Sequence, residues 1–462
     1  LLRYRPEPRN DFAMNENNQM TRRHFIHKTS ATASAASLTA LASAIGQKDA
    51  AGTDELKIGL IGCGGRGSGA CAQALQATET PVKLWSMGDL FPDQIEASYK
   101  MLSEGAGKRY DRQAFPPLAK QMDVPKDRRF AGFDCFQKVV DSGVDLVILA
   151  APPGFRPQHF EAAIKADKHV FMEKPVAVDP PGIRRIIAAS RLAKEKKLSV
   201  IAGTQRRHQN HYIEIMKRVH DGAIGEILAG QCYWNMGPLW VEDAKKHWES
   251  YQTGKWSDME YQCRNWLFHV WLSGDHICEQ HVHNIDIMHW AIGSDPKMVS
   301  GQGGRQERVQ PQYGNGFDHF AVELEFDNNV RVTSMCRQQS GASFQVAERL
   351  VGTKGQVYLD GNTGRILGEK AYNYDGEDND PYVTEHANLI KSIRNGDGRN
   401  EGEQVARSTM SAIAGRMAAY TGRSMKWAWA HKTSKLDLSP PKYAFGDLPV
   451  DPPAIPGVTK LI

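Results

Sequence analysis

A glycine-rich hexapeptide near the start of the chain has the spacing of a phosphate-binding turn. It reads Gly62-Cys63-Gly64-Gly65-Arg66-Gly67 and fits the pattern G-x-G-x-x-G. The first glycine permits a tight turn, the second lets the backbone approach a pyrophosphate, and the third allows a helix to pack closely on a strand. The free N–H groups of the helix start would then bind phosphate oxygens. A glycine-rich turn without a ligand is the alternative.

A carboxylate at a fixed distance from this turn bears on the type of dinucleotide. Asp89 lies 27 residues after Gly62, at the end of a second apolar run. A carboxylate at this position accepts hydrogen bonds from a ribose diol and repels a 2′-phosphate. Asp89 therefore favours NAD over NADP, with a surface aspartate as the alternative.

A histidine-rich segment farther along the chain holds side chains that can transfer protons. It reads Glu279-Gln280-His281-Val282-His283. On a helix, residues four apart lie on one face, so Glu279 and His283 would be neighbours, with His276 and Asp286 on the same stripe. Histidine titrates near neutral pH and a carboxylate can orient it, as general acid/base catalysis requires. The spacing matches no common zinc pattern, so we expect no metal, although these residue types can bind one.

The elements that must position these residues alternate between strand and helix. Short apolar runs without polar alternation, which are typical of buried parallel strands, occur at residues 56–61, 82–87, 146–151, 169–172 and 198–202. Helical patterns occur at residues 68–77, 158–165 and 182–197. This order predicts βαβ units and a parallel sheet. The glycine turn thus has the strand before it and the helix after it that its motif requires.

Further candidate ligand-binding residues follow the ends of these predicted strands. Pro152 and His159 come after the third clear strand, and Glu173-Lys174-Pro175 comes directly after the next. In sheets of this kind ligands bind beyond the carboxyl ends of the strands. These residues are therefore expected at the crevice that holds the dinucleotide.

In this position the Glu-Lys-Pro tripeptide resembles that of the Gfo/Idh/MocA family, the glucose–fructose oxidoreductase and inositol dehydrogenase group. The resemblance extends over residues 55–430 and includes the stretches at 203–207, 222–226 and 421–423. It implies an α/β fold, with an N-terminal Rossmann dinucleotide-binding domain and a C-terminal α/β domain that has a large, mostly antiparallel open sheet. Apolar residues that alternate with polar ones on both sides of residues 327–329 predict a hairpin of such a sheet.

The resemblance also implies catalytic roles. The family usually carries an Asp-x-x-x-His pair, and here Glu279 stands in place of the aspartate while His283 matches the histidine. We expect NAD-dependent hydride transfer at a ring hydroxyl of a sugar or cyclitol. His283 would be the general acid/base, Lys174 its electrostatic and proton-relay partner, and Glu279 the orienting group.

Two further sets of residues are predicted to contact ligands. The predicted contacts of the cofactor are Gly62, Gly64, Gly65, Arg66, Gly67, Asp89, Pro152, His159, Glu173 and Lys174. The predicted contacts of the substrate are Arg206, Arg207, His208, Arg264, Trp266 and His283. For residues 206–208 a basic loop without a ligand is the alternative.

Tryptophan is concentrated in the second half of the chain. Seven of the ten tryptophans lie within residues 234–290. Such rings can stack on sugars, and a subdomain core or an oligomer interface is the alternative. The polar, tryptophan-rich segment 237–265 is predicted to be a long insertion over the active site without regular structure.

A second type of reaction fits the same residues. In a redox-neutral glycoside hydrolase or lyase, NAD transiently oxidises a sugar hydroxyl, the aglycone is eliminated, and the hydride returns. Export with a trapped cofactor would favour this reaction, whereas the resemblance and the lack of a glycosidase motif favour the dehydrogenase.

The chain divides into four predicted parts. These are a leader with a twin-arginine signal at 1–44, an NAD(P)-binding domain at 54–176, a substrate-binding domain at 177–430 and a proline-rich arm at 431–462. Arg22-Arg23 and a mild apolar stretch ending Ala42-Ser43-Ala44 resemble a twin-arginine export signal. They predict a periplasmic or secreted protein. Nucleotides are scarce outside the cytoplasm, so the cofactor should be tightly bound.

Composition limits the partners. The net charge of +4 over 462 residues is concentrated at 1–44, where six basic and three acidic residues lie, and the remainder is close to neutral. A near-neutral body argues against a nucleic-acid partner. No segment after the leader reads as a membrane span. The seven cysteines form no CxxC pair and are expected to be free thiols. The resemblance suggests a homo-oligomer.

Overall fold

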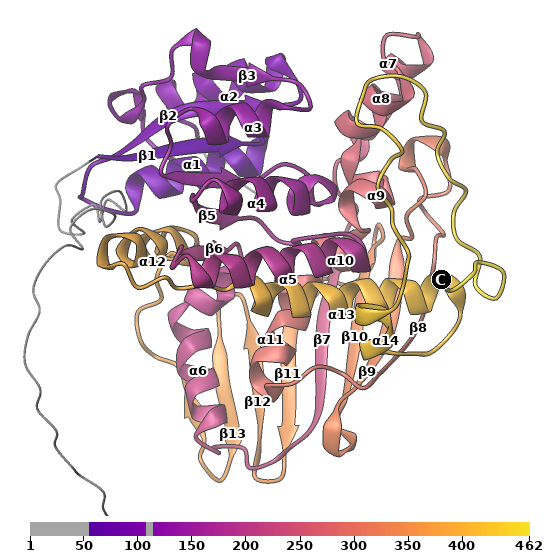
Figure 1. The fold of residues 1–462 in the computed structure, drawn as a ribbon. Helices are drawn as coiled ribbons and strands as arrows, with labels where there is room; N and C mark the ends of the chain where they lie inside the picture. The colour runs from indigo at the N-terminus through magenta and orange to yellow at the C-terminus, as the bar shows by residue number, and fades with distance from the viewer. Residues whose placement is uncertain (1–54, 108–113) are drawn as a thin grey trace, which may run out of the picture. The chain divides into compact units, whose positions relative to one another are not determined.

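Residues 55–107 and 114–462 are the part of the chain that the computed structural model describes. They belong to one compact unit, drawn in Figure 1. The leader and twin-arginine signal predicted at residues 1–44 lie outside these residues, as does residue 54.

A six-stranded sheet forms the first layer, in the order β3-β2-β1-β4-β5-β6. All of its strand pairs are parallel, as the buried apolar runs predicted. The strands are β1 (Leu56–Ile61), β2 (Val82–Asp89), β3 (Arg129–Ala131), β4 (Leu146–Leu149), β5 (His169–Met172) and β6 (Val200–Ala202).

Helices cover both faces of this sheet, which makes it a Rossmann fold. Apolar residues of α1 (Gly65–Gln76) and α2 (Pro92–Glu104) pack on one face. The other face is covered by α3 (Cys135–Asp141), α4 (Arg156–Lys165) and α5 (Pro180–Glu195). Short 3-10 turns complete the connections at η1 (Ala119–Gln121), η2 (Lys126–Arg128) and η3 (Pro153–Phe155).

A helix from late in the sequence completes the first domain. Leu389 and Ile390 of α12 (Pro381–Asn395) pack into the same core as α1 and β1, and Figure 1 shows α12 near α1. Asp380 caps α12 by accepting hydrogen bonds from the N–H groups of Tyr382 and Val383, and Pro381 occupies the first turn, where its missing N–H costs nothing.

The second sheet has nine strands in the order β14-β13-β12-β11-β7-β10-β9-β8-β15. The β7–β10 pair is parallel and every other pair is antiparallel, which confirms the predicted fold class. The strands are β7 (Ile227–Met236), β8 (Met298–Gly304), β9 (His319–Glu325), β10 (Arg331–Gln338), β11 (Gln345–Gly352), β12 (Gly355–Asp360), β13 (Gly364–Gly368), β14 (Tyr372–Asn373) and β15 (Met425–Lys426).

One face of this sheet packs against helices and the opposite face is open. Along β10, Val332 and Ser334 are buried while Arg331 and Met335 are exposed, the period-two pattern of a half-covered sheet. The predicted hairpin is present as β9, η7 (Asp327–Asn329) and β10. The covering helices are α6 (Asn210–His220), α11 (Val282–Ile292), α13 (Gly402–Thr421) and α14 (Trp427–Lys432).

The segment after β7 differs from its prediction. Residues 237–265 were expected to lack regular structure, but they contain α7 (Val241–Gln252) and α8 (Asp258–Arg264). The Ser257 side chain caps α8 by accepting a hydrogen bond from the N–H of Glu260. The helices were missed because the apolar residues of this segment show only weak helical periodicity. Short turns follow at η5 (Trp266–Phe268), α9 (Val270–Ser273) and α10 (His276–Glu279).

The chain beyond α14 follows the surface as an arm without helices or strands. Tyr443 and Leu448 pack into a cluster with Phe91 and Phe155 of the first domain and Met259 of α8. The arm thus binds the segment after β7 to the dinucleotide-binding domain.

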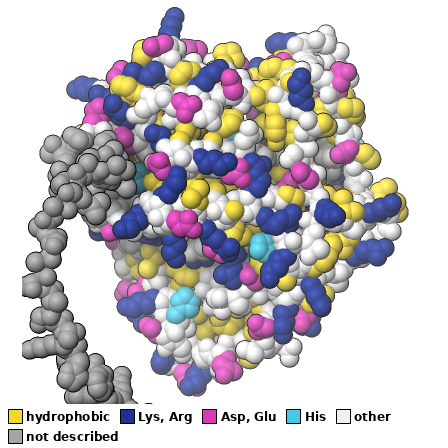
Figure 2. All heavy atoms as spheres, in the orientation of Figure 1, with side chains coloured by type: hydrophobic (Ala, Val, Ile, Leu, Met, Phe, Trp, Pro, Cys, Tyr) yellow, Lys and Arg dark blue, Asp and Glu magenta, His cyan; other side chains and the backbone are white. Residues whose placement is uncertain are grey.

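The described surface agrees with a near-neutral composition. On the face shown in Figure 2, basic and acidic side chains are interspersed. Within the described ranges, no helix combines the length and apolar character that crossing a bilayer demands.

Candidate active site

A cavity of about 780 Å³ lies between the carboxyl ends of the parallel strands and the second domain. Every residue predicted to contact the cofactor lines it, and so do Glu279, His283, Arg264 and Trp266. A cavity of this size is large enough for a small-molecule ligand. The structure therefore brings the glycine turn and the proposed proton-transfer groups to one space.

The three motif glycines have the geometry that a dinucleotide needs. Gly62 has a φ of +96°, and a Cβ there would lie 2.2 Å from the backbone nitrogen of Ala151. A Cβ on Gly67 would lie 1.8 Å from the carbonyl oxygen of Gly62. Around Gly64, by contrast, a Cβ would meet no protein atom within 4 Å and would project into open space beside the cavity. The cradle above the start of α1 thus fits a pyrophosphate.

Asp89 sits at the end of β2 with its carboxylate fixed by backbone donors. Its oxygens accept hydrogen bonds from the N–H of Cys63 at 2.7 Å and from the N–H of Phe91 at 2.9 Å. Burial raises the pKa of this carboxyl, and the two backbone bonds act against that rise. The group is held at the position where a ribose diol would bind.

Arg66 and Glu173 form an ion pair in the wall of the cavity. The Arg66 Nε donates to Glu173 Oε1 at 2.5 Å, and its guanidinium lies over the Tyr382 ring. Burial lowers the pKa of His159 to about 3, so its imidazole is neutral at physiological pH. The charged groups of this wall, Arg66 and Glu173, are thus paired with each other, and His159 carries no charge.

Lys174 and Glu279 join the two domains across the cavity. Lys174 follows β5, and its Nζ donates to the backbone oxygen of Glu279 and to Glu279 Oε1, the latter at 3.2 Å. The two side chains are only 13% and 17% exposed. The ammonium is thereby fixed in direction, with its remaining donor capacity available to a ligand.

His283 lies in the first turn of α11 and faces the same cavity. Its ring stacks on Trp234 with a centroid distance of 5.6 Å. Burial, followed by the positive charges of Lys174 and Arg206, lowers the pKa of His283 well below its ordinary value. The imidazole is therefore neutral at physiological pH and can accept a proton.

The predicted helical relation of Glu279 and His283 needs correction. The helix α10 ends at Glu279 and α11 begins at Val282, with Gln280 and His281 between them. Both side chains line the cavity even so. Glu279 contacts Lys174 rather than His283, so in the structure the lysine is the group that this carboxylate orients.

The other histidines of this segment point to separate partners. His276 Nδ1 lies 3.1 Å from Asp275, and His281 Nε2 lies 2.7 Å from Ser334 Oγ. In the described residues no three His, Cys, Asp or Glu side chains are arranged to hold a metal ion.

The structure does not place Arg206, Arg207 and His208 in the cavity wall. Arg206 is buried in an ion pair with Glu348, Arg207 pairs with Asp286 at 2.6 Å, and His208 lies 3.5 Å from Glu401. Buried carboxylates require such partners. Arg206 and Arg207 of η4 (Gln205–His208) thus neutralise buried acids of the second domain.

Arg264 lines the cavity at its dinucleotide end rather than beside Lys174. It makes a two-point ion pair with Asp93 at 3.0 and 3.2 Å and a third contact with Glu260 at 3.1 Å. Its guanidinium also lies 3.8 Å from the centroid of the Phe91 ring. Arg264 therefore connects α8 to the dinucleotide-binding domain.

Sequence reasoning missed the contribution of α12. Asp380, Tyr382 and Val383 line the cavity although they follow the glycine turn by some three hundred residues. The Asp-Pro pair at the start of α12 was the available signal for a helix, but nothing local to it indicates the site.

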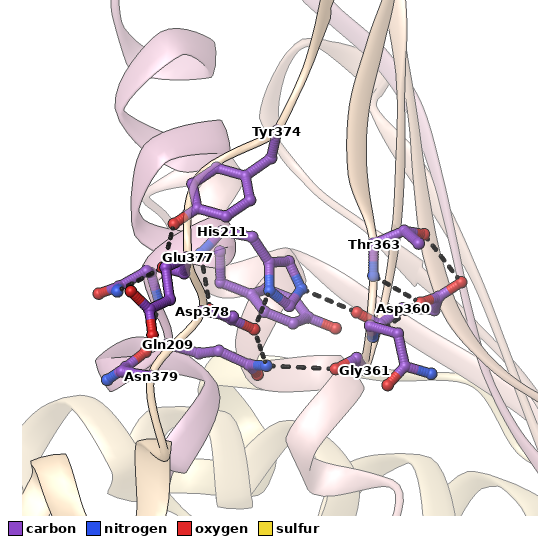
Figure 3. A network of polar contacts seen from close by, with 12 residues as sticks. Gln209, His211, Asp360, Gly361, Thr363, Tyr374, Glu377, Asp378 and Asn379 are labelled. Carbon is purple, nitrogen blue, oxygen red and sulfur yellow. Dashed lines mark hydrogen bonds and ion pairs between the residues drawn. The ribbon is translucent and has the colours of Figure 1, made fainter.

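A polar network holds the segment that leads into α12 (Figure 3). His211 contacts Asp378 through Nδ1 at 2.7 Å and the carbonyl oxygen of Asp360 through Nε2 at 2.9 Å. Gln209 donates to Asp378 at 2.7 Å, and Asn379 donates to the carbonyl oxygen of His208 at 2.7 Å. The network fixes the position from which Asp380 and Tyr382 reach the cavity.

Both domains match family models. Residues 56–204 match the oxidoreductase family with an NAD-binding Rossmann fold, and residues 212–358 match the GFO/IDH/MocA C-terminal domain.

Individual relatives match over part of the chain. The 2,7-anhydro-N-acetylneuraminate hydratase of Escherichia coli K12 is 28% identical over 221 residues, which are 47% of this chain and 52% of that protein. The inositol 2-dehydrogenase of Salmonella paratyphi B is 28% identical over 166 residues, 36% of this chain and 40% of that protein. The chain thus spans about half the length of these curated relatives.

Solved structures show the same fold. The aldose–aldose oxidoreductase from Caulobacter crescentus complexed with glycerol superimposes with a TM-score of 0.61 at 19% identity, over 81% of this chain and 100% of that one.

The glycine geometry leads to a paired prediction. Gly64→Ala should fold normally, because its φ of −73° suits any residue, but should bind cofactor at least about tenfold more weakly because the Cβ occupies the cradle. Gly67→Ala should lower the free energy of unfolding by about 2–4 kcal/mol because its Cβ meets backbone. Thermal unfolding and cofactor titration measure both effects. Equal destabilisation by the two substitutions would contradict the assignment.

Proposed function

The chain belongs to the Gfo/Idh/MocA oxidoreductase family, and on that premise we propose that it transfers a hydride between a ring hydroxyl of a sugar or cyclitol and a tightly bound NAD. One observation carries the proposal. Lys174 and His283, which come from different domains, line the cavity that also holds the glycine turn.

The side chains divide the chemistry at the hydroxyl. The neutral imidazole of His283 takes the hydroxyl proton as the C–H bond breaks. The Lys174 ammonium lies where it can stabilise the negative charge that develops on the oxygen, and Glu279 fixes its direction. A dinucleotide held by the glycine turn and Asp89 would supply the hydride-accepting group in this cavity.

The cofactor is proposed to be NAD rather than NADP. The Asp89 carboxylate, held by two backbone donors, would pair with ribose hydroxyls and repel a 2′-phosphate. The nearby Arg264 supports this assignment, because its guanidinium is already bound by Asp93 and Glu260 and offers little to a further phosphate.

A redox-neutral hydrolase or lyase is the second candidate. It would use the same groups, with His283 or Lys174 moving the proton of the adjacent C–H bond. The relative from Escherichia coli carries the name of a hydratase, which favours this alternative.

Three measurements on protein purified without added nucleotide test the proposal. Mass spectrometry should detect bound NAD. Free sugars or cyclitols should increase absorbance at the NADH band if the protein is a dehydrogenase, whereas steady nitrophenol release from nitrophenyl glycosides without added NAD would indicate the redox-neutral reaction.

The variant Lys174→Ala should lose at least about a hundredfold in either activity, because it removes the charge that faces the reacting oxygen. Circular dichroism and nucleotide content serve as controls for folding and cofactor binding. Full activity of this variant would refute the proposed site.

The retention of the cofactor is proposed to depend on Arg264. This residue and the carboxyl-terminal arm hold α8 against the dinucleotide-binding domain. Arg264→Met should therefore speed the release of NADH about tenfold, as measured by fluorescence after dilution. Arg191→Met, which removes an exposed ion pair with Glu403, should leave the release rate unchanged. Equal release rates in all three proteins would contradict the proposal.

Export and assembly complete the proposed function. The paired arginines Arg22 and Arg23 and the small-residue site ending at Ala44 support twin-arginine export of the folded protein. Cell fractionation after Arg22→Lys and Arg23→Lys tests it, with retention in the cytoplasm as the expected result. The apolar side chains Met335, Val351 and Leu367 exposed on the second domain support a homo-oligomer, which light scattering in solution tests.

A further inference from the structure

The part of the cavity wall that follows β7 is aromatic and apolar. Leu239, Trp240, Trp266, Leu267 and Phe268 line the same cavity as Lys174 and His283. We propose that this wall, called the aromatic wall here, is a second carbohydrate subsite, so that the substrate is an uncharged glycoside with a further ring beyond the sugar that is oxidised. The inference rests on the proposed function, because it names the substrate class of that same site.

Trp240 is the least ordinary member of the aromatic wall. It adopts a left-handed conformation with a φ of +53°, and 42% of its surface is exposed. A bulky residue with positive φ is an outlier, and such conformations cluster at ligand clamps. A tryptophan with this exposure also forgoes much of the burial that its size offers. A ligand ring stacked on the indole would cover this exposed surface.

The neighbours of Trp240 give the wall a fixed shape. Its ring meets the ring of Trp266 edge to face, with a centroid distance of 5.6 Å and an angle of 68°. Trp266 in turn packs against the cluster formed by Phe91, Phe155 and Met259. The two indoles therefore present a preformed surface, and sugar rings bind such surfaces through their apolar C–H faces.

The wall begins close to the reacting groups. Trp234, near the end of β7, stacks on His283, and Leu239 and Trp240 follow within six residues. Because Trp240, Lys174 and His283 line one cavity, the proposed ligand would place one ring beside Lys174 and His283 and a second ring against Trp240.

The charges of this wall argue against an acidic second ring. Among the described cavity-lining residues between 237 and 268, the charged ones are Asp243 and Arg264. Arg264 is bound by Asp93 and Glu260, and Asp243 would repel a carboxylate. Burial lowers the pKa of His247, which leaves it neutral at physiological pH. A uronic acid or a phosphosugar would thus find no free cation here.

The test compares matched substrates on protein that holds its cofactor. Each free sugar is paired with a neutral glycoside, in which it is linked to glucose as the second ring, and with a uronide, in which glucuronic acid is the second ring. The p-nitrophenyl glycoside of each sugar serves as a chromogenic reporter of turnover. Reduction of bound cofactor and release of nitrophenol are both followed. We expect kcat/KM to be about tenfold higher for the neutral glycoside than for the free sugar. The uronide should have a lower kcat/KM than the neutral glycoside.

Variants locate the effect. Trp240→Ala should reduce the glycoside-to-sugar ratio of kcat/KM about tenfold, and Trp240→Phe should restore most of it. Trp248→Ala serves as the matched control, because Trp248 belongs to the same insertion but packs on Tyr251 and Tyr261 away from the cavity lining. That variant should keep the ratio of the parent protein.

Calorimetry on Lys174→Ala measures binding affinity without turnover and without a Trp240 variant. The glycoside should bind to this variant about tenfold more tightly than the free sugar. Equal use or equal binding of sugar and glycoside, a preference for the uronide, or an unchanged ratio in Trp240→Ala would overturn the inference and leave the dehydrogenase proposal standing. If no substrate of any kind reduced the cofactor or released nitrophenol, the proposed function itself would fail, and this inference with it.

Discussion

The contact between Lys174 and Glu279 is the constraint on which the site depends. It links the carboxyl end of β5 to α10, and therefore links the dinucleotide-binding domain to the substrate domain. Because both groups are largely buried, each would carry a substantial desolvation cost without the other. The backbone oxygen of Glu279 adds a second acceptor for the same ammonium. The direction of the lysine is thus set by one residue of the other domain.

Pairing of buried charges extends to other arginines in and around the cavity wall. Arg66 is held by Glu173, Arg206 by Glu348 and Arg207 by Asp286. Each ion pair is satisfied within the protein, so little reorganisation is needed when charge develops on a substrate oxygen. The surrounding cations still act at a distance, since they contribute with burial to the low pKa of His283. The site combines a neutral base with a fixed cation without leaving an unpaired charge.

Local patterns in the sequence were sufficient for much of the fold and for the cofactor end of the site. The roles of Gly62 and Gly67 follow from the motif because turn geometry and close packing depend on immediate neighbours. The paired acids of Arg206 and Arg207 could not be found this way, because Glu348 and Asp286 come from distant elements. The helix break after Glu279 was missed for a similar reason: spacing alone cannot show where tertiary contacts interrupt a helix.

The cavity is lined by groups on regular strands and helices and by a segment that side-chain contacts hold in place. The glycine turn, Lys174 and His283 lie on or next to regular strands and helices, where backbone hydrogen bonds hold groups to the accuracy that proton and hydride transfer require. The wall around Trp240 belongs instead to the segment between β7 and α11, which the carboxyl-terminal arm and Arg264 secure from outside. A segment held by side-chain contacts can change in sequence without disturbing the strands that carry the chemistry. On the proposed function, the two sheets would hold the reacting groups and this aromatic segment would select the substrate.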